Sequence, residues 1–428
     1  MTDATETSSF EWSSPQAHAR RRRRYAADRR LKLYGIAAIA VAIGLLGILI
    51  VSLVAKGYLA FVETVVTIDV TVPAGAADPA DPAKANYRAI VADSFGALFP
   101  EVTDRRALRD LNGILSRGAS LKVRDMVAAD PGLIGKTFAV SVPVSDPFDQ
   151  LSKGVIDRTL PENRRRVSDR EIAWFEQLEA QGRVEKVFNS GLFLDADSRF
   201  PELAGLAGAV VGSFYALLVC FLISFPLGIA AAVYLEEFAP KNRITDLIEV
   251  NINNLAAVPS IVFGLLGLAL FIQTFGLPRS APLVGGMVLS LMTLPTIIIV
   301  TRAALKSVPP SIRQAALGVG ASKHEVILHH VLPLAVPGIL TGTIIGLAQA
   351  LGETAPLLLI GMNAFLTSPP GGIMDPATAL PTQIYIWADS PERGFVALTS
   401  AGILVLLGFL IVMNGIAIFL RQRFERTW

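Results

Sequence analysis

The chain has 428 residues, of which 52% are hydrophobic and only 17% are charged. Soluble globular domains carry about 25% charged residues, so this balance predicts an integral membrane protein. The net charge of +2 gives no general basis for binding nucleic acid, and the single cysteine, Cys220, excludes an intrachain disulfide and a metal site with Cys/His spacing.

A basic tail, residues 1–34, precedes the first apolar segment. Residues 35–55 carry no charge and are long enough to cross the bilayer. A secretory signal peptide also joins a basic start to an apolar run, but its apolar core is usually about 7–15 residues, so we favour an uncleaved transmembrane helix over residues 35–56. The arginines at positions 20–24 are interpreted as an orientation signal beside anionic lipid, in preference to a nucleic-acid contact.

Residues 57–202 have the composition of a soluble domain, with 18 Lys and Arg against 21 Asp and Glu between residues 59 and 200. A Pro/Ala/Asp-rich linker is expected at residues 73–82, and Ser168 with Glu171 forms a capping box that opens a helix. Hydrophobic periodicity predicts strands at residues 65–72 and 137–144 and helices at residues 85–98, 104–115 and 168–181. We therefore expect an α/β insert domain.

One segment of this insert, Gly132 to Thr137, has the composition of a nucleotide-binding P-loop. A P-loop needs four residues between its glycines, so that successive N–H groups surround the phosphates. Here only two residues separate Gly132 from Gly135, and Asp130 stands where the first glycine belongs. The chain is therefore expected to bind no nucleotide, other cofactor or metal, and not to hydrolyse ATP.

Five further apolar segments follow, at residues 203–235, 255–275, 283–300, 334–351 and 395–420. Pro295 and Pro337 lie inside two of them, and neighbouring helices can satisfy the backbone groups that proline frees. Lys and Arg cluster before the first span, after residue 300 and after residue 420, where Arg421, Arg423 and Arg426 stand. This pattern predicts an all-α protein with six transmembrane helices, both termini in the cytoplasm and the insert outside.

The loop between the fourth and fifth spans, residues 305–333, is polar although apolar spans flank it. A proline pair at 309–310 and Gly320 are expected to divide it into two short helices. The second helix is opened by a capping box of Ser322 and Glu325 and is expected to end at Leu332-Pro333. Such a hairpin can present Ala315 and Ala316 to a groove in a partner protein, although an amphipathic loop lying on the membrane is an alternative.

The fifth span has small residues at every fourth position, namely Gly338, Gly342, Gly346 and Ala350. This pattern lets helices approach closely. At 100° per residue, Gln349 and Glu353 fall on the same side, so Glu353 is expected on the packing face and away from lipid. A carboxylate at this depth is either a functional group or a structural partner of a neighbouring helix.

The hairpin resembles the EAA-x3-G-x9-I-x-L-P motif of ABC importer permeases, through the spacing of Gln314, Ala315, Ala316, Gly320, Leu332 and Pro333. In that family the hairpin docks on a cytoplasmic ATPase dimer. Two residues depart from the motif: Gln314 replaces Glu, and His330 replaces Ile. Because Gln314 keeps the shape but not the charge, we expect docking to depend on packing more than on charge.

Three other strings are similar to phosphate importer permeases, AVPSIVFG at 257–264, LPT at 294–296 and GETAPLL at 352–358. The last resembles the A-type (PstA-like) membrane subunit, and the resemblance covers residues 203–428. It implies a type I (MetI-like) permease domain in the bacterial inner membrane, and a non-catalytic subunit of an ATP-driven phosphate importer. The implied partners are a C-type permease, an ATPase dimer, an extracytoplasmic phosphate-binding protein and the lipid bilayer, with no nucleic acid. The resemblance implies no role for the insert.

The translocation path or gate is expected to include Gln349, Gly352, Glu353, Thr354, Pro356 and Pro295. An ionised Glu353 would repel phosphate, so pairing with an arginine or latching the gate suits it better. Similar permeases often have Arg where Gln349 stands, and no Lys or Arg lies inside a predicted span. Positive charge is therefore expected from the partner permease and from backbone N–H groups at broken helices near Pro295 and Pro356.

Three other functions stay open. Import of a different oxyanion, such as molybdate or sulfate, is one, although the GETAPLL string argues against it. A secondary transporter usually shows internal repeats and ion-coupling residues within the membrane, and neither is evident. A membrane-anchored sensor, with a ligand site in the insert, is the third.

Overall fold

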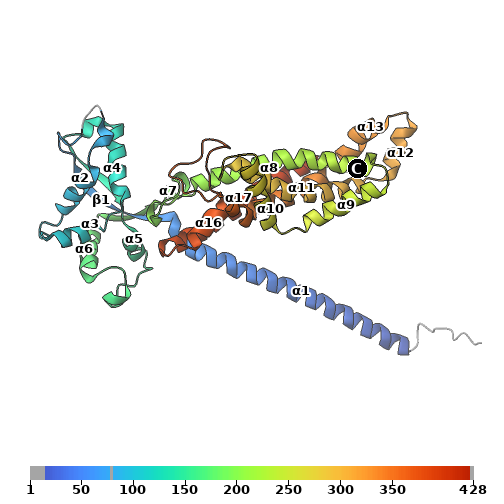
Figure 1. Ribbon diagram of the computed structural model, residues 1–428. Helices are drawn as coiled ribbons and strands as arrows, with labels where there is room; N and C mark the ends of the chain where they lie inside the picture. The colour runs from blue at the N-terminus through green and yellow to red at the C-terminus, as the bar shows by residue number, and fades with distance from the viewer. Residues whose placement is uncertain (1–14, 78–80, 425–428) are drawn as a thin grey trace, which may run out of the picture. The chain divides into compact units, whose positions relative to one another are not determined.

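The computed structural model describes residues 15–77 and 81–424 and divides into two compact units at residue 55 (Figure 1). The first unit contains most of α1 (Pro15–Gly57), a 43-residue helix that includes the predicted first span. The basic segment with arginines 20–24 belongs to the same helix as the apolar segment. The start of the basic tail, part of the 73–82 linker and Arg426 lie outside the described residues.

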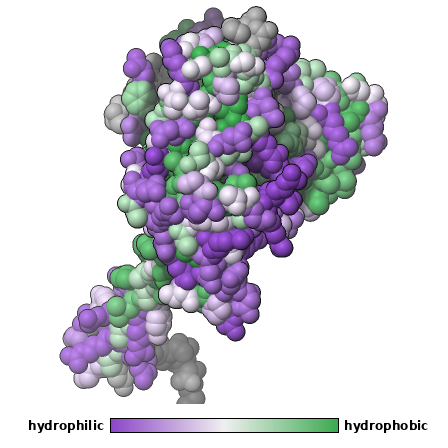
Figure 2. Space-filling model, turned by 90° about the vertical axis from the view of Figure 1, so that its left-hand side faces the viewer, coloured by the Kyte–Doolittle hydropathy of each residue, from purple (hydrophilic) through white to green (hydrophobic). Residues whose placement is uncertain are grey.

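The insert is built on a three-stranded antiparallel sheet of order β2-β1-β3. The strands are β1 (Val62–Thr71), β2 (Thr137–Pro143) and β3 (Val184–Phe188), and Ile68 pairs with Val140 in the register. Alternate residues of β1 enter the core, as the sequence pattern predicts. The insert face shown in Figure 2 is mainly hydrophilic, which suits a domain in water.

Five helices of the insert surround this sheet: α2 (Tyr87–Gly96), α3 (Arg105–Asn112), α4 (Gly118–Ala129), α5 (Asp146–Ser152) and α6 (Asp169–Ala180). The predicted capping box is present: Ser168 Oγ accepts a hydrogen bond from the Glu171 N–H, and the Glu171 carboxylate accepts one from the Ser168 N–H. Asp104 caps α3 in a similar way. The hydrophobic pattern did not predict α4, α5 or β3. Short 3-10 turns lie at η1 (Tyr58–Phe61), η2 (Pro82–Lys84), η3 (Pro131–Leu133), η4 (Glu162–Arg164) and η5 (Pro201–Leu203).

Within the described residues, five helices are long and apolar enough to cross a membrane, or six if one bent pair counts as a span. Besides α1 they are α8 (Ala207–Val233), which continues as a π-helical turn η6 (Tyr234–Phe238), α11 (Pro282–Ser307), α14 (Leu332–Gly352) and α17 (Gly394–Phe424). These correspond to five of the six predicted spans.

The third predicted span, residues 255–275, is continuously helical only from residue 260, and a break precedes it. The chain forms α9 (Arg243–Ala256), then α10 (Ser260–Gly267) and the π-helical η7 (Leu268–Thr274), and the two parts are bent by 99°. Pro259 explains the break, because a proline disfavours helical geometry in the residue before it. Counting apolar residues did not predict this break.

The helices α8 and α11 run side by side (Figure 1). A methyl group added at Gly228 would lie 2.6 Å from Ile297 Cγ2, and one added at Gly286 would lie 2.5 Å from the Ala216 carbonyl oxygen. Glycine at these two positions therefore permits the close contact of the two helices. Val288 of α11 and Phe263 of α10 belong to one buried core.

Between α14 and α17 the chain forms two short helices that the sequence analysis did not predict, α15 (Ala355–Leu359) and α16 (Leu380–Ala388). Trp387 of α16 is buried, and its Nε1 donates to Asp197 Oδ1 at 3.2 Å. Asn189 Nδ2 also donates to the Ala60 carbonyl at 3.0 Å, close to α7 (Gly191–Leu194). These bonds connect the end of the insert to the segments that flank it.

The hairpin consists of α12 (Pro310–Gly318), α13 (Lys323–Glu325) and the π-helical η8 (Val326–Val331) (Figure 1). The predicted division at Gly320 and the Ser322–Glu325 capping box are both present. The prediction that the second helix ends at Leu332-Pro333 is wrong, because η8 continues directly into α14. The wider π-turn just before Pro333 gives a physical reason, since it relieves the clash of the proline ring with the preceding turn.

Candidate functional site

The tip of the hairpin exposes apolar side chains. Leu317 is 51% exposed and Val319 is 87% exposed, and Gln314 and Ala315 of α12 are exposed beside them. Gly320 follows with φ of +93°, a conformation that residues with a side chain rarely adopt. The turn therefore depends on glycine, and it leaves an apolar surface at the tip of the hairpin.

Ala316 does not belong to this exposed surface, so the expectation that it faces a partner is wrong. It is buried in a small core with Val308, Val326 and Val331, which the hairpin forms with the ends of α11 and α14. The two neighbouring alanines lie about 100° apart around α12, so Ala315 points outward while Ala316 packs in the core. Leu332 and Pro333, half-buried, continue from this core into α14.

Ion pairs and hydrogen bonds join the hairpin to the end of α8 and the end of α11, and further ion pairs join these two helices to α9. Arg313 of α12 donates to Glu237 Oε1 at 2.7 Å and to the carbonyl oxygens of Leu305 and Val308 at the end of α11. Arg302 of α11 bridges Glu236 of η6 and Glu249 of α9, at 3.3 and 2.5 Å. The sequence analysis used these arginines only for orientation. The Glu236-Glu237 pair at the end of a span was a signal that it overlooked.

The expected helix break near Pro295 is absent: α11 runs from Pro282 to Ser307 with Pro295 buried inside it. The expected break near Pro356 is present. The helix α14 ends at Gly352, Glu353 adopts extended geometry, and α15 starts at Ala355 with Pro356 in its first turn. Gly352 is exposed, whereas Glu353 and Thr354 are half-buried.

The short helix α15 after this break packs on α10, the helix that follows the break at Pro259. A methyl group added at Gly264 of α10 would lie 2.7 Å from Pro356 Cα and 2.9 Å from Leu359 Cδ1. The strings AVPSIVFG and GETAPLL, about 90 residues apart in the sequence, are therefore packed together. Two interrupted helices meet here, where freed backbone groups can serve a polar ligand.

The small-residue face of α14 packs on α11. Added methyl groups would lie 2.7 Å from Ala304 Cβ at Gly338 and 2.3 Å from Val300 Cγ1 at Gly342. Gly346 and Ala350 are buried along the same face.

Gln349 does not share the packing face of α14, contrary to expectation. It is exposed together with Ile345 and Gly352, which follow one another by four and three residues on the opposite side of the helix. Glu353 leaves this helical register because α14 has ended before it. The prediction applied the helical spacing of 100° per residue to Glu353, which lies one residue beyond the end of α14.

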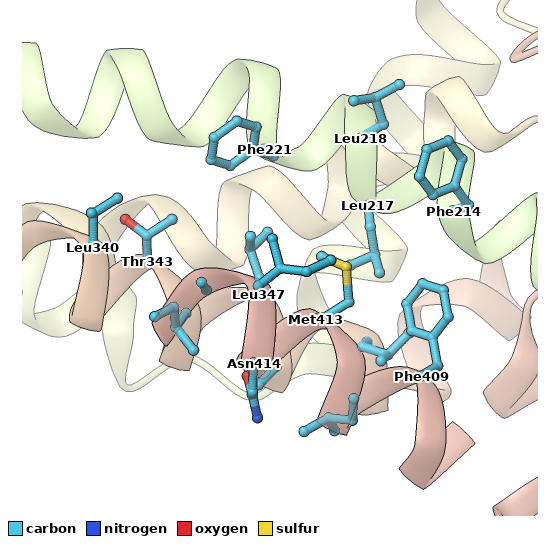
Figure 3. Close-up of a pocket in the computed structure, with 16 residues that line it drawn as sticks. Phe214, Leu217, Leu218, Phe221, Leu340, Thr343, Leu347, Phe409, Met413 and Asn414 are labelled. Atoms are coloured by element: carbon cyan, nitrogen blue, oxygen red, sulfur yellow. The ribbon is translucent and has the colours of Figure 1, made fainter. Parts of the chain in front are cut away.

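An apolar cavity of about 230 Å³ lies between α8, α14 and α17 (Figure 3). Its lining includes Phe221, Leu347 and Met413, with Thr343 and Asn414 as polar exceptions. The Thr343 hydroxyl donates to the Ile339 carbonyl at 2.9 Å and is thereby satisfied. Such a lining suits hydrocarbon and would not stabilise an anion.

Comparison with known proteins gives two family matches. Residues 224–426 match the family described as binding-protein-dependent transport system inner membrane component, and residues 18–162 match a domain of unknown function, DUF3333. The chain is also similar to the MetNI methionine ABC transporter in inward-facing conformations, with 17% identity, a TM-score of 0.38 and coverage of 52% of this chain and 95% of that chain.

Two relatives extend these matches. The chain is 32% identical over 226 residues to the probable ABC transporter permease protein YqgI of Bacillus subtilis, covering 49% of this chain and 75% of the relative. It is 32% identical over 235 residues to the phosphate transport system permease protein PstA of Haemophilus influenzae, covering 55% and 80%. The chain therefore belongs to the PstA-type permeases of ABC importers, multi-pass and non-catalytic membrane subunits with the type I permease fold, and it carries the DUF3333 region in addition.

Proposed function

We propose that this chain imports inorganic phosphate together with a second, C-type permease, with which it forms the translocation path. An ATPase dimer in the cytoplasm drives transport through the hairpin of residues 307–333, and an extracytoplasmic phosphate-binding protein delivers the ion. This chain binds no cofactor in the proposal, since ATP is held by the partner subunits. The protein lies in the bacterial inner membrane with both termini in the cytoplasm.

The observation that carries the coupling role is the braced, apolar tip of the hairpin. Leu317 and Val319 are exposed, while Ala316 and Arg313 fix α12 to the ends of the membrane helices. An element that transmits movement has to be both accessible to its partner and rigidly attached to the helices it moves. This arrangement also favours docking in a protein groove over a loose amphipathic loop on lipid.

The path role is supported by the paired helix breaks around Pro259 and Glu353. The amide of Gln349 is exposed beside the second of them, and because an exposed amide is unfavourable against lipid, a polar path shared with the second permease suits it. We propose that Glu353 latches this region. In the purified complex, Glu353→Gln should slow ATP-driven uptake of radiolabelled phosphate, and an unchanged rate would exclude the latch.

The coupling role is tested in the complete importer, reconstituted in liposomes, by measuring ATP hydrolysis and phosphate uptake together. Gly320→Trp should uncouple hydrolysis from uptake, because it strains the turn and places a bulky ring on the docking surface. Gln314→Glu should leave both rates nearly unchanged. A severe defect from Gln314→Glu would contradict docking by shape, and full coupling in Gly320→Trp would contradict the hairpin's role.

The side of the membrane is tested by labelling. The native Cys220 is buried, so Val319→Cys places one accessible thiol at the tip. A membrane-impermeant maleimide should react in inverted vesicles and not in intact cells. Reaction from the outside would overturn the proposed orientation.

A further inference from the structure

The insert contains a cleft of about 710 Å³ lined by parts of α2, α3 and α4. Three arginines line it, Arg88 from α2, Arg109 from α3 and Arg117 immediately before α4. All three side chains are exposed. Because they come from three separate elements, it is the fold of the insert that gathers them around one cavity.

These arginines lack acidic partners in the part of the chain that the structure describes, where no ion pair includes Arg88, Arg109 or Arg117. Other arginines of the insert behave differently, since Arg158 is held by two glutamates and Arg183 by Asp69. The Arg117 guanidinium lies 4.8 Å from the centroid of the Phe200 ring, which orients the group without neutralising it. Three uncompensated like charges around one cavity repel one another until an anion is bound.

The first turn of α4 also borders the cleft. The 12-residue helix α4 begins at the cleft, and the N–H of its first residue, Gly118, donates to Ser116 Oγ at 3.2 Å. Ser120 and Ser145 also line the cleft, but their hydroxyl groups donate to the Arg117 and Gly113 carbonyl oxygens, so the arginines are the main donors to an anion. The positive partial charge at the N-terminus of α4 adds to the positive charge of the arginines.

One acidic residue, Glu202, also lines the cleft. Its Oε1 accepts from Ser116 Oγ at 2.7 Å, which orients the carboxylate. One carboxylate stands against three guanidinium groups. The cleft is therefore net positive within an insert whose acidic residues outnumber its basic ones.

We propose that this cleft binds a phosphate group, either as free inorganic phosphate or as the headgroup of an anionic lipid. Guanidinium groups recognise phosphate oxygens through paired, charge-assisted hydrogen bonds. The volume exceeds that of one phosphate ion, which leaves room for a larger molecule that carries the group. The lining residues Phe200 and Glu202 precede the membrane helix α8 by only a few residues, so lipid headgroups and free ions are both within reach.

The test uses the full chain in phospholipid-free detergent and two probes. Binding of radiolabelled inorganic phosphate is measured by equilibrium dialysis, and binding of phosphatidylglycerol, against phosphatidylcholine, by native mass spectrometry. The test variant is Arg109→Gln with Arg117→Gln. The control is Arg106→Gln with Arg164→Gln, which removes the same charge from exposed arginines of the insert that do not line the cleft. Circular dichroism and melting of each variant verify the fold.

The test variant should bind one of the two probes at least about tenfold more weakly than the control, because each lost charge-assisted bond weakens binding substantially. A selective loss of inorganic phosphate identifies the free ion as the ligand, and a selective loss of phosphatidylglycerol identifies the headgroup. Equal affinities in the test and control variants would overturn the proposal. A wild-type chain that binds neither probe would also overturn the proposal, even if that chain captured an acidic protein. These binding assays involve no transport, so their outcome does not depend on the proposed importer function.

Discussion

Arg313 offers the sharpest test of how the hairpin is attached. Its guanidinium pairs with Glu237 at 2.7 Å, and the two side chains are only 23% and 10% exposed. The same group donates to the carbonyl oxygens of Leu305 and Val308, where α11 ends. A cation at a helix C-terminus also interacts favourably with the helix dipole. One side chain therefore connects α12, the end of α8 and the end of α11.

Arg313→Gln removes the cation and leaves Glu237 nearly buried without a partner. Breaking a fully buried pair in this way costs about 3–5 kcal/mol, and the partial exposure of Arg313 reduces the expected loss to about 2–3 kcal/mol. A loss of about 2 kcal/mol changes the ratio of attached to detached hairpin roughly 30-fold. Adding Glu237→Gln removes the unpaired charge and should restore about 1 kcal/mol or more, so the double variant should be better than the sum of the two single variants.

The assay compares phosphate uptake per ATP hydrolysed in the reconstituted importer with the melting temperature of the purified complex. Lys306→Gln is the matched control, because Lys306 is 59% exposed and lies 3.5 Å from Glu236, a contact worth less than about 1 kcal/mol. Arg313→Gln should lower the coupling ratio strongly and Lys306→Gln hardly at all. Equal coupling in the two variants, or strictly additive effects of Arg313→Gln and Glu237→Gln, would refute the reasoning.

Two further outcomes follow from packing and from buried carboxyl groups. Gly342→Leu should prevent recovery of an intact complex in gel filtration, because even a methyl group there would lie 2.3 Å from Val300; Gly408→Ala, with open space around it, should be tolerated. Burial raises the pKa values of Asp146, Asp197 and Glu202, so the folded insert binds protons more tightly than the unfolded chain, and the free energy of unfolding should rise as pH falls from 7 toward about 5. Asp104 and Asp157, whose pKa values hydrogen bonds lower, act only below about pH 4. A lower melting temperature at pH 5.5 than at pH 7 would contradict this sign.

The sequence predicted those elements whose signals are local. Apolar length located α8, α11, α14 and α17, and capping boxes located the starts of α6 and α13. Alternation located β1 and β2. In each case the residues that carry the signal also make the bonds or bury the face that the signal describes.

The errors arose where a neighbour decides the outcome. Pro259 breaks a helix while Pro295 does not, although both stand in apolar sequence. Pro295 is buried within a helix that packs along its length on α8, and that packing outweighs the cost of the missing N–H. Ala316 is likewise buried by its neighbours Val326 and Val331, which pack in the same core only because the chain turns at Gly320.

The two helix breaks say more about transport than either does alone. A break within the membrane leaves N–H and C=O groups without helical partners, and hydrocarbon cannot satisfy them. Gly264 of α10 lies in close contact with Pro356 of α15, so the helices that follow the two breaks are packed together. Two breaks whose following helices pack together can share one polar zone, in which the same water or ion satisfies both. We therefore expect the phosphate path to pass this junction, and not the apolar cavity between α8, α14 and α17, where the polar exceptions are few.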